Sequence, residues 1–170
     1  MKKDRGRKRT CGTCSHEAAV HTTDYRFNLV GLPVLLKRIE VIRCPHCGNI
    51  DPVIPDLNGL MHAIAFAVIG FPCRLSGEQV RFLRKYLGIS ADEFSELLHV
   101  DRTTLSKWEN GQEIGPQSDR LIRLVVLSKS EELRGKAGEL MERWNDIEDC
   151  SPRRRPQLRI DAETLKYQYA

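Results

Sequence analysis

Two pairs of cysteines near the N-terminus have the spacing of a metal site. Cys11 and Cys14 form one Cys-x-x-Cys pair, and Cys44 and Cys47 form another further along the chain. Each pair offers two thiolates from a single turn, and four thiolates complete the tetrahedral shell that Zn²⁺ prefers in structural sites. Because this shell leaves no position for water, the spacing predicts one structural zinc ion and no catalytic metal.

These cysteines also have two competing interpretations, a redox dithiol and a chance pairing of buried thiols. His16, His21 and His46 are candidate substitute ligands, although four thiolates already fill the shell. Neither pair lies in a strand-helix-strand context, and the sequence contains no convincing Ser-His-Asp set or phosphate-binding loop. We therefore expect no catalytic residue and no enzymatic activity.

The chain has 170 residues and a formal net charge of +4. This length accommodates one domain or two small ones with modest cores, and we expect two. The positive charge is concentrated in Met1–Thr10 and in Arg153–Arg155. Such runs permit contact with nucleic acid, but solvated basic tails have the same composition.

The basic N-terminus is followed by Cys and Thr rather than by an apolar run, so no secretion signal is expected. The longest apolar segment, Leu60–Phe71, is too short to span a bilayer, and no membrane partner is expected. We expect a cytoplasmic protein of a prokaryotic cell, associated with the nucleoid through DNA. Cysteines stay reduced in that compartment, which favours metal binding over disulfides. Cys73 lies outside the zinc pattern and is expected to be a buried or spare thiol.

The segment between the cysteine pairs has the pattern of strands. Tyr25–Leu29 alternates apolar and polar residues, and Val34–Arg43 is rich in branched apolar residues, with a turn near Gly31–Pro33. The simplest arrangement is a three-stranded sheet that zinc closes at one end. Such a core is too small to be stable alone, so zinc binding, worth about 10–16 kcal/mol in small sites, would supply most of its folding free energy.

An apolar helix follows an extended linker. Asp51–Pro55 contains two prolines that disfavour helix in the preceding residue, and the next segment, up to Phe71, places its apolar residues on one face. This helix either packs as a linker helix on one of the two domains or forms part of an oligomer surface.

The stretch Ser90–Gly111 has the pattern of two short helices joined by a tight turn. Ser90 and Glu93 form a capping box at the start of the first helix. Asp101 is a good N-cap for the second, and Asn110 with Gly111 ends it.

The second of these helices buries Leu105 and Trp108, which lie three residues apart. Its outward side carries a polar row of Arg102, Thr103, Ser106 and Lys107. A short polar helix held by another helix across it suits the major groove of DNA. An ordinary solvated amphipathic pair is the alternative.

Further helices are expected on both sides of this stretch. A capping box of Ser76 and Gln79 starts one that ends near Gly88, and Gly115-Pro116 precedes another. A fifth is suggested over residues 131–148, where a narrow apolar stripe serves either helix pairing or the domain core.

The order of these features, with Leu-Ser-Lys-Trp-Glu-Asn-Gly after a capped helix, closely resembles the helix-turn-helix of Xre and phage-repressor-like regulators. The resemblance covers about Leu75–Leu127. It implies an all-α domain that binds double-stranded DNA. It also implies that Arg84 pairs with Glu109, a structural ion pair that ties the first helix to the end of the recognition helix.

The same resemblance assigns roles to the recognition helix. Arg102, Thr103 and Lys107 match base-reading positions, whereas Thr104, Ser106 and Asn110 lie near phosphates. Arg or Lys can bind the two acceptors of guanine, and each good bidentate pair discriminates by about 1–3 kcal/mol. Ala91 departs from the pattern, because relatives often have Gln there to clamp a phosphate and a base.

The two cysteine pairs followed by this domain resemble the MqsA (YgiT-type) zinc-finger antitoxin family over about Cys11–Leu127. The resemblance implies a homodimeric repressor that reads a palindromic operator, autoregulates its operon as a type II antitoxin, and holds a toxin partner with its zinc domain. Ser15, where the family often has Gly, and the longer tail beyond Leu127 are departures. The alternative is a stand-alone Xre-family regulator with a structural or redox- or metal-sensing finger and no toxin.

The predicted fold class is α+β, with a small zinc-bound β-sheet domain followed by an all-α helix-turn-helix domain. We expect the fragment 75–148 to fold without the finger. The expected parts are a basic N-terminus (1–10), the zinc-binding β domain (11–55), an apolar linker helix (56–73), the DNA-binding domain with its C-terminal helix (74–149), and a flexible basic tail (150–170) with a short ordered end near Leu165–Tyr169.

Overall fold

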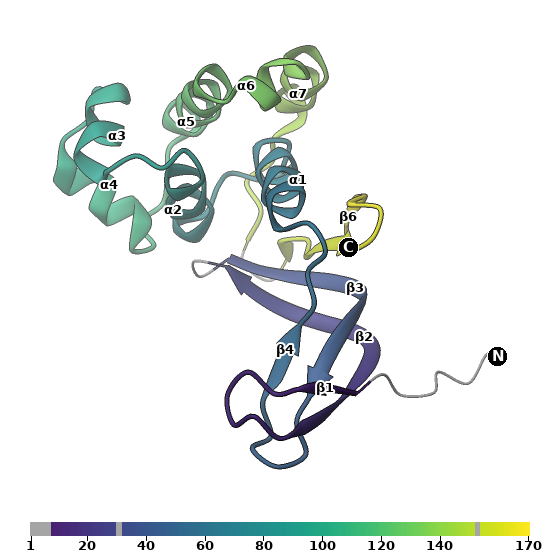
Figure 1. Cartoon of the computed structure of the whole chain (residues 1–170). Coiled ribbons are helices and arrows are strands. Elements are labelled where there is room, and N and C mark those ends of the chain that lie inside the picture. The colour runs from purple at the N-terminus through teal and green to yellow at the C-terminus, as the bar shows by residue number, and fades with distance from the viewer. Residues whose placement is uncertain (1–7, 30–31, 152–153) are drawn as a thin grey trace.

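The computed structural model describes residues 8–29, 32–151 and 154–170, and it shows a twisted sheet with helices against one half of it (Figure 1). The basic residues expected to form tails at 1–7 and at Arg153 lie outside the described residues. The strands of the sheet are β1 (Lys8–Thr10), β2 (Glu17–Leu29), β3 (Leu32–Arg43), β4 (Ile50–Pro52), β5 (Leu158–Asp161) and β6 (Tyr167–Tyr169).

The helices follow one another between β4 and β5, and the fold is α+β as predicted. They are α1 (Leu57–Ile69), α2 (Gly77–Tyr86), α3 (Ala91–Leu97), α4 (Arg102–Glu109), α5 (Pro116–Lys129), α6 (Glu131–Arg134), α7 (Ala137–Arg143) and the short 3-10 helix η1 (Trp144–Asp146). In the described part of the chain, no helix combines the length and the apolar character needed to cross a membrane.

The hairpin of β2 and β3 is the frame of the sheet. Apolar residues of β3 alternate with more exposed ones, so that Val34, Leu36 and Val41 are buried. The register between the two strands shifts next to Asp24, whose Oδ1 accepts the backbone N–H of Arg38 at 3.1 Å. This irregularity divides the hairpin into an end that carries β1 and β4 and an end that faces the helices (Figure 1).

The C-terminal segment belongs to the sheet, which corrects two expectations. β5 runs parallel to β3, pairing Arg159 with Leu35, and β6 pairs antiparallel with β5. The sheet therefore has six strands in the described residues rather than three. β5 also replaces part of the expected flexible tail, because Leu158 and Ile160 are buried in the core. β6 falls within the short end, Leu165–Tyr169, that was expected to be ordered.

Helix α1 packs in the core of the protein. Its buried residues pack in one continuous cluster with residues of β3, β5 and α2 to α7. Asp56 caps its N-terminus by accepting the N–H of Gly59 at 2.8 Å. Of the two arrangements expected for this helix, packing on the domains is the one observed.

A buried ion pair ties α5 to the segment between α1 and α2. The guanidinium of Arg123 is fully buried and donates to both carboxylate oxygens of Asp119 and to the carbonyls of Ile69, Phe71 and Cys73. These contacts use all five of its N–H donors. Three of the acceptors precede residue 75, so the fragment 75–148 would leave a buried charge without them, and we no longer expect it to fold alone.

A disulfide joins Cys73 to Cys150, so Cys73 is buried, as expected, but it is not a free thiol. Backbone hydrogen bonds bring the two segments together, from Glu148 to the carbonyl of Pro72 at 2.8 Å and from Arg74 to the carbonyl of Glu148 at 3.1 Å. The pairing could not be read from the spacing of the cysteines, because 77 residues separate them.

The fifth helix expected over 131–148 is broken into α6, α7 and η1. Leu133, Leu140 and Trp144 of its apolar stripe are buried in the common core, so the stripe completes the domain rather than pairing helices. The gap between α6 and α7 includes Gly135, in agreement with the low helix propensity of glycine.

Candidate nucleic-acid interface and metal centre

The helix-turn-helix consists of α3, the turn 98–101 and α4. Ser90 accepts the N–H of Glu93 at 3.1 Å at the start of α3, and His99 in the turn has a φ of +52°. Asp101 stands at the N-cap position of α4, but its side chain makes no capping hydrogen bond, contrary to expectation. Leu105 and Trp108 are buried as predicted, which fixes the face that α4 turns to solvent.

Three predicted base-reading residues, Arg102, Thr103 and Lys107, are all exposed on α4. The Nε of Arg102 lies 3.0 Å from Oδ1 of Asp92 on α3, with the Arg102 side chain 50% exposed. An exposed ion pair contributes little to stability, so Arg102 can exchange Asp92 for a base edge at small cost. These positions therefore form a polar surface that is accessible to a groove.

The residues expected near phosphates are less free. Thr104 and Ser106 are half-buried, and Asn110 donates from Nδ2 to the carbonyl of Ser106 at 2.8 Å. The Oδ1 of Asn110 also accepts from Arg81 at 3.3 Å. Asn110 thus helps to close the C-terminus of α4 within the protein.

Two arginines of α2 hold the end of α4. Arg84 donates from Nε to Oε1 of Glu109 at 2.7 Å, the ion pair that the family resemblance implied. Arg81 adds a bond to the backbone carbonyl of Glu109 at 2.7 Å, a contact that the sequence analysis missed. The spacing of three residues between Arg81 and Arg84, which places both on one helical face, was the signal that could have indicated it.

Glycine allows α2 to approach α4 this closely. A β-carbon added to Gly77 would overlap the carbonyl oxygen of Trp108 and lie 3.0 Å from the carbonyl carbon of Glu109. The first turn of α2 therefore packs against the backbone at the end of the recognition helix. Together with Arg81 and Arg84, this contact sets the position of α4 relative to the rest of the domain.

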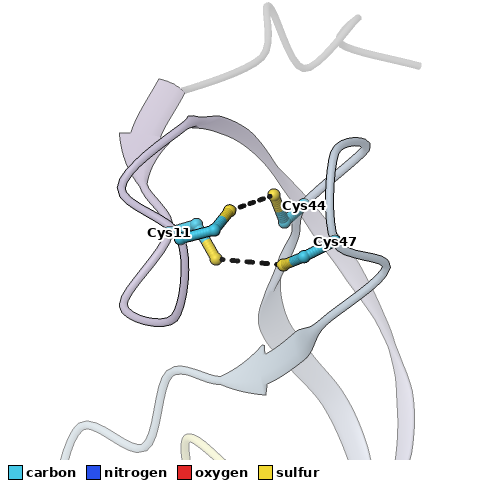
Figure 2. Close-up of side chains that lie close together, drawn as sticks. Cys11, Cys44 and Cys47 are labelled. Carbon is cyan, nitrogen blue, oxygen red and sulfur yellow. Dashed lines mark hydrogen bonds between the residues drawn. The ribbon is translucent and has the colours of Figure 1, made fainter.

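The predicted metal ligands come together at the end of the hairpin away from the helices. The loops that carry the two cysteine pairs have the same backbone pattern: Ser15 donates to the carbonyl of Cys11 and Gly48 to that of Cys44, each at 3.0 Å. Figure 2 shows the thiols converging from these loops. Ala18 and the two first cysteines form a small buried cluster separate from the main core.

The distances between the sulfurs fit a tetrahedral metal. The Sγ atoms of Cys11 and Cys47 are 3.6 Å apart, and those of Cys14 and Cys44 are 3.5 Å apart (Figure 2). A tetrahedron with Zn–S bonds of about 2.3 Å has edges of about 3.8 Å. All four Sγ atoms lie within 4.8 Å of one another, so these thiolates can hold one metal ion and leave no position for substrate.

Backbone amides prepare the first cysteine of each pair for metal binding. Hydrogen bonds from the backbone of Cys14 and Thr13 lower the pKa of Cys11 to about 6. Those from Cys47 and then His46 lower the pKa of Cys44. Desolvation and hydrogen bonds with Cys11 and Cys44 raise the pKa of Cys14 and of Cys47, although a backbone hydrogen bond opposes this at each. Because a thiolate and not a thiol is the ligand, the first cysteine of each pair is ready to bind a metal, whereas the second must lose its proton when the metal binds.

The histidines expected as substitute ligands have different surroundings. The rings of His16 and His46 are stacked, with their centroids 3.6 Å apart. Both rings lie close enough to the Sγ of Cys14 to bind the same metal ion as that thiol. His21 lies in β2 opposite Val41 and is in neither of the ligand groups found among the described residues. Four thiolates fill the tetrahedral shell without any of these rings.

Comparison with known proteins agrees with the geometry of the helical part. A family model described as a helix-turn-helix domain matches residues 77–129, which contain α2 to α5. No curated protein and no solved structure matches the chain significantly. The fold and this match define a DNA-binding helix-turn-helix regulator, to which an N-terminal cluster of four cysteines with the geometry to hold a metal ion is joined.

Proposed function

We propose that the chain is a sequence-specific transcriptional repressor that inserts α4 into the major groove of its own operator. The observation that carries the proposal is the exposed row of Arg102, Thr103 and Lys107 on a helix whose end is held by Arg84. Arg and Lys can each bind guanine O6 and N7, and the Thr methyl can contact a thymine methyl. The C-terminal end of α4 is positioned by α2, so these side chains reach the groove from a helix that is held in place.

The active form proposed here is a homodimer on a palindromic operator. Two recognition helices about 34 Å apart would occupy successive major grooves on one face of DNA. Leu121 and Leu124 support this proposal, because these apolar residues of α5 are 39% and 43% exposed. Replacing both with Glu is expected to give a monomer in sedimentation and to weaken operator binding.

The proposed metal is a structural Zn²⁺ held by the four thiolates of Cys11, Cys14, Cys44 and Cys47. In this proposal the protein acts as a type II antitoxin of the MqsA type, and its cysteine-bearing hairpin binds a toxin. The support is the order of the two parts, with the cysteine cluster before the helix-turn-helix. We propose no enzymatic activity, and catalytic reduction of a model disulfide by the zinc-loaded protein would contradict this.

The DNA-binding proposal is tested by titrating the zinc-loaded protein onto DNA from its own upstream region and onto scrambled DNA. The variant Arg102→Ala/Lys107→Ala removes two predicted base contacts. A matched control, Lys129→Ala/Arg134→Ala, removes the same charge from exposed positions on α5 and α6. Each titration is repeated at two salt concentrations, because phosphate contacts are salt-dependent.

We expect the wild type and the control to prefer the upstream DNA by a factor that persists at the higher salt concentration. The α4 variant should lose most of this preference, since each lost bidentate contact costs about 1–3 kcal/mol. Equal binding of all three proteins to both DNAs, abolished by salt, would mean that only phosphates are contacted. The assignment of α4 as the reading helix would then be wrong.

The antitoxin proposal is tested by co-expression with the product of an adjoining gene. The wild-type protein should relieve growth arrest caused by that product and co-purify with it in a defined ratio. A Cys44→Ser variant should lose both properties if the hairpin is the binding surface. An adjoining gene product that causes no arrest, or that is not bound, would leave a regulator without a toxin.

A further inference from the structure

A basic cavity of about 430 Å³ lies where β3, β5 and the turn between β5 and β6 meet. Neither the metal-site cysteines nor α4 contributes to its walls. The charged residues that line it are four cations, Lys37, Arg38, Arg159 and Lys166, and one carboxylate, Asp161. This excess of positive charge favours an anion in the cavity.

Two of these cations already have acidic partners. Lys37 pairs with Asp24, and Arg38 pairs with Asp161. Asp161 in addition accepts the N–H and the hydroxyl of Thr164, at 2.9 and 3.0 Å. Both carboxylates are therefore already hydrogen-bonded, Asp24 to residues of β3 and Asp161 to Arg38 of β3 and to Thr164.

These two carboxylates are ionised at neutral pH. The hydrogen bond from Lys37 is the main reason that the pKa of Asp24 lies below its usual value, and the charge of Arg159 also contributes. Arg38 is the main reason that the pKa of Asp161 is low. Arg159 and Lys166 have no ion pair within the described residues, and they remain to bind an anion.

Arg159 is held with an unsatisfied donor. Its Nε is buried and has no hydrogen-bond partner among the residues that the structure describes, and no other buried side-chain nitrogen or oxygen there is in this condition. Its backbone lies in β5, opposite Leu35 on one side and Gln168 on the other, so the sheet fixes the position of its Cα beside the cavity. A buried donor without an acceptor is costly, and proteins rarely keep one without a partner.

We propose that this cavity is a binding site for a small phosphate-bearing anion, with Arg159 donating to the phosphate and Lys166 and the neighbouring cations balancing its charge. Guanidinium binds phosphate through two parallel N–H bonds, which an Nε and a terminal nitrogen supply. This inference goes beyond the proposed repressor function. It gives the protein a second ligand besides DNA, and this ligand is bound by the sheet and not by the helix-turn-helix.

The site is tested by replacing Arg159 with Met, which keeps much of the aliphatic length and removes the charge and the orphan donor. The matched control is Arg26→Met. Arg26 is exposed on β2 and pairs with Leu35 of β3, which pairs in turn with Arg159 of β5. Arg26 and Arg159 therefore lie on the same face of the sheet, but Arg26 does not line the cavity. Thermal unfolding midpoints are measured in inorganic phosphate and in chloride at equal ionic strength and pH, and phosphate binding is measured by calorimetry.

We expect phosphate to raise the midpoint of the wild type and of Arg26→Met in a concentration-dependent way. In chloride, the unfolding midpoint of Arg159→Met should be at least as high as that of the wild type, because the unsatisfied donor is gone. Phosphate should not raise the midpoint of this variant. Its affinity for phosphate should fall about tenfold or more. Because this variant stays folded in chloride, loss of the phosphate effect cannot be attributed to misfolding.

Two results would overturn the proposal. In the first, phosphate raises the unfolding midpoint of Arg159→Met as much as that of the wild type, or it raises the midpoint of none of the proteins. Either outcome would mean that no phosphate site exists at Arg159. In the second, free phosphate has no effect but Arg159→Met binds operator DNA more weakly, and the phosphate recognised is then that of DNA. Failure of the repressor proposal is separate, since it is measured with the Arg102 and Lys107 variant.

Discussion

Ser15 has the backbone conformation that glycine adopts at the matching position of the other metal loop. Its φ is +61°, and that of Gly48 is +75°. A left-handed conformation costs a residue with a side chain about 1–2 kcal/mol, whereas glycine adopts it freely. The departure from the family pattern at Ser15 is therefore a local destabilisation of the first loop.

Ser15→Gly is expected to raise the stability of the metal-loaded hairpin, by at most about 1 kcal/mol because glycine also gains entropy when unfolded. The reverse change in the second loop, Gly48→Ser, should lower it by a similar amount. Resistance to a chelator, followed as metal release, measures both variants. If both changes act in the same direction, backbone conformation is not the cause.

Arg123 shows how one buried residue joins distant segments. Arg123→Met would leave the carboxylate of Asp119 buried without its partner and three carbonyls without donors, which we expect to cost about 3–5 kcal/mol. Arg123→Lys should rescue little, because an ammonium cannot reproduce five donors in a planar fork. Urea unfolding measures the loss, with Arg120→Met on the exposed side of α5 as the control. A loss of less than about 1 kcal/mol would show that the pair is replaceable.

At the scale of elements, the position of the recognition helix depends on its contact with α2. The contact is made by Gly77 and the backbone of Trp108 and is reinforced by Arg81 and Arg84 on Glu109. Hydrogen bonds to a backbone carbonyl and to a carboxylate fix both the distance and the rotation of α4. A change that separates the two helices should therefore act on DNA recognition as well as on stability.

Gly77→Ala tests this contact. The added methyl group would meet backbone atoms that cannot rotate away, so we expect a loss of stability of about 1–3 kcal/mol and weaker operator binding. Gly138→Ala in α7 is the control, since nothing lies within 4 Å of its added β-carbon and the change should stabilise the protein by about 0.5–1 kcal/mol. Thermal unfolding and DNA titration measure both variants. Equal operator affinity in the two would mean that α4 does not depend on Gly77.

At the scale of the whole molecule, two cores of unequal size stabilise the sheet. The main core joins the helices to β3 and β5, and the small one surrounds Cys11 and Cys44. The hairpin of β2 and β3 passes through both. Loss of the small core therefore need not destroy the large one.

Metal removal is expected to unfold the cysteine end of the hairpin alone. Amide hydrogens in β1 and β4 should exchange rapidly after chelation, because metal binding supplies most of the folding free energy of such small sites. Amides in α2 to α5 should keep their protection, since their core contains no metal ligand. Hydrogen exchange followed by mass spectrometry, before and after chelation, gives both readings. Loss of protection throughout the chain would show that the two cores fold as one.

The sequence alone determined the features that depend on nearby residues. The two Cys-x-x-Cys turns and the helix with Leu105 and Trp108 on one face were predictable, because spacing of two to four residues sets which side chains share a turn or a helical face. The capping bond expected from Asp101 is absent, so that local prediction was wrong. The match of residues 77–129 to a helix-turn-helix domain confirms the prediction for the helices. The cysteine cluster agrees with a metal site.

Only the tertiary structure decided which distant segments meet. The pairing of β5 with β3, the disulfide between Cys73 and Cys150, and the acceptors of Arg123 each join residues far apart in the chain. Such contacts leave no local period, since they arise from shape and from the need to satisfy buried polar groups. For the same reason the unsatisfied Nε of Arg159, and the cavity that Arg159 lines, became visible only in the folded chain.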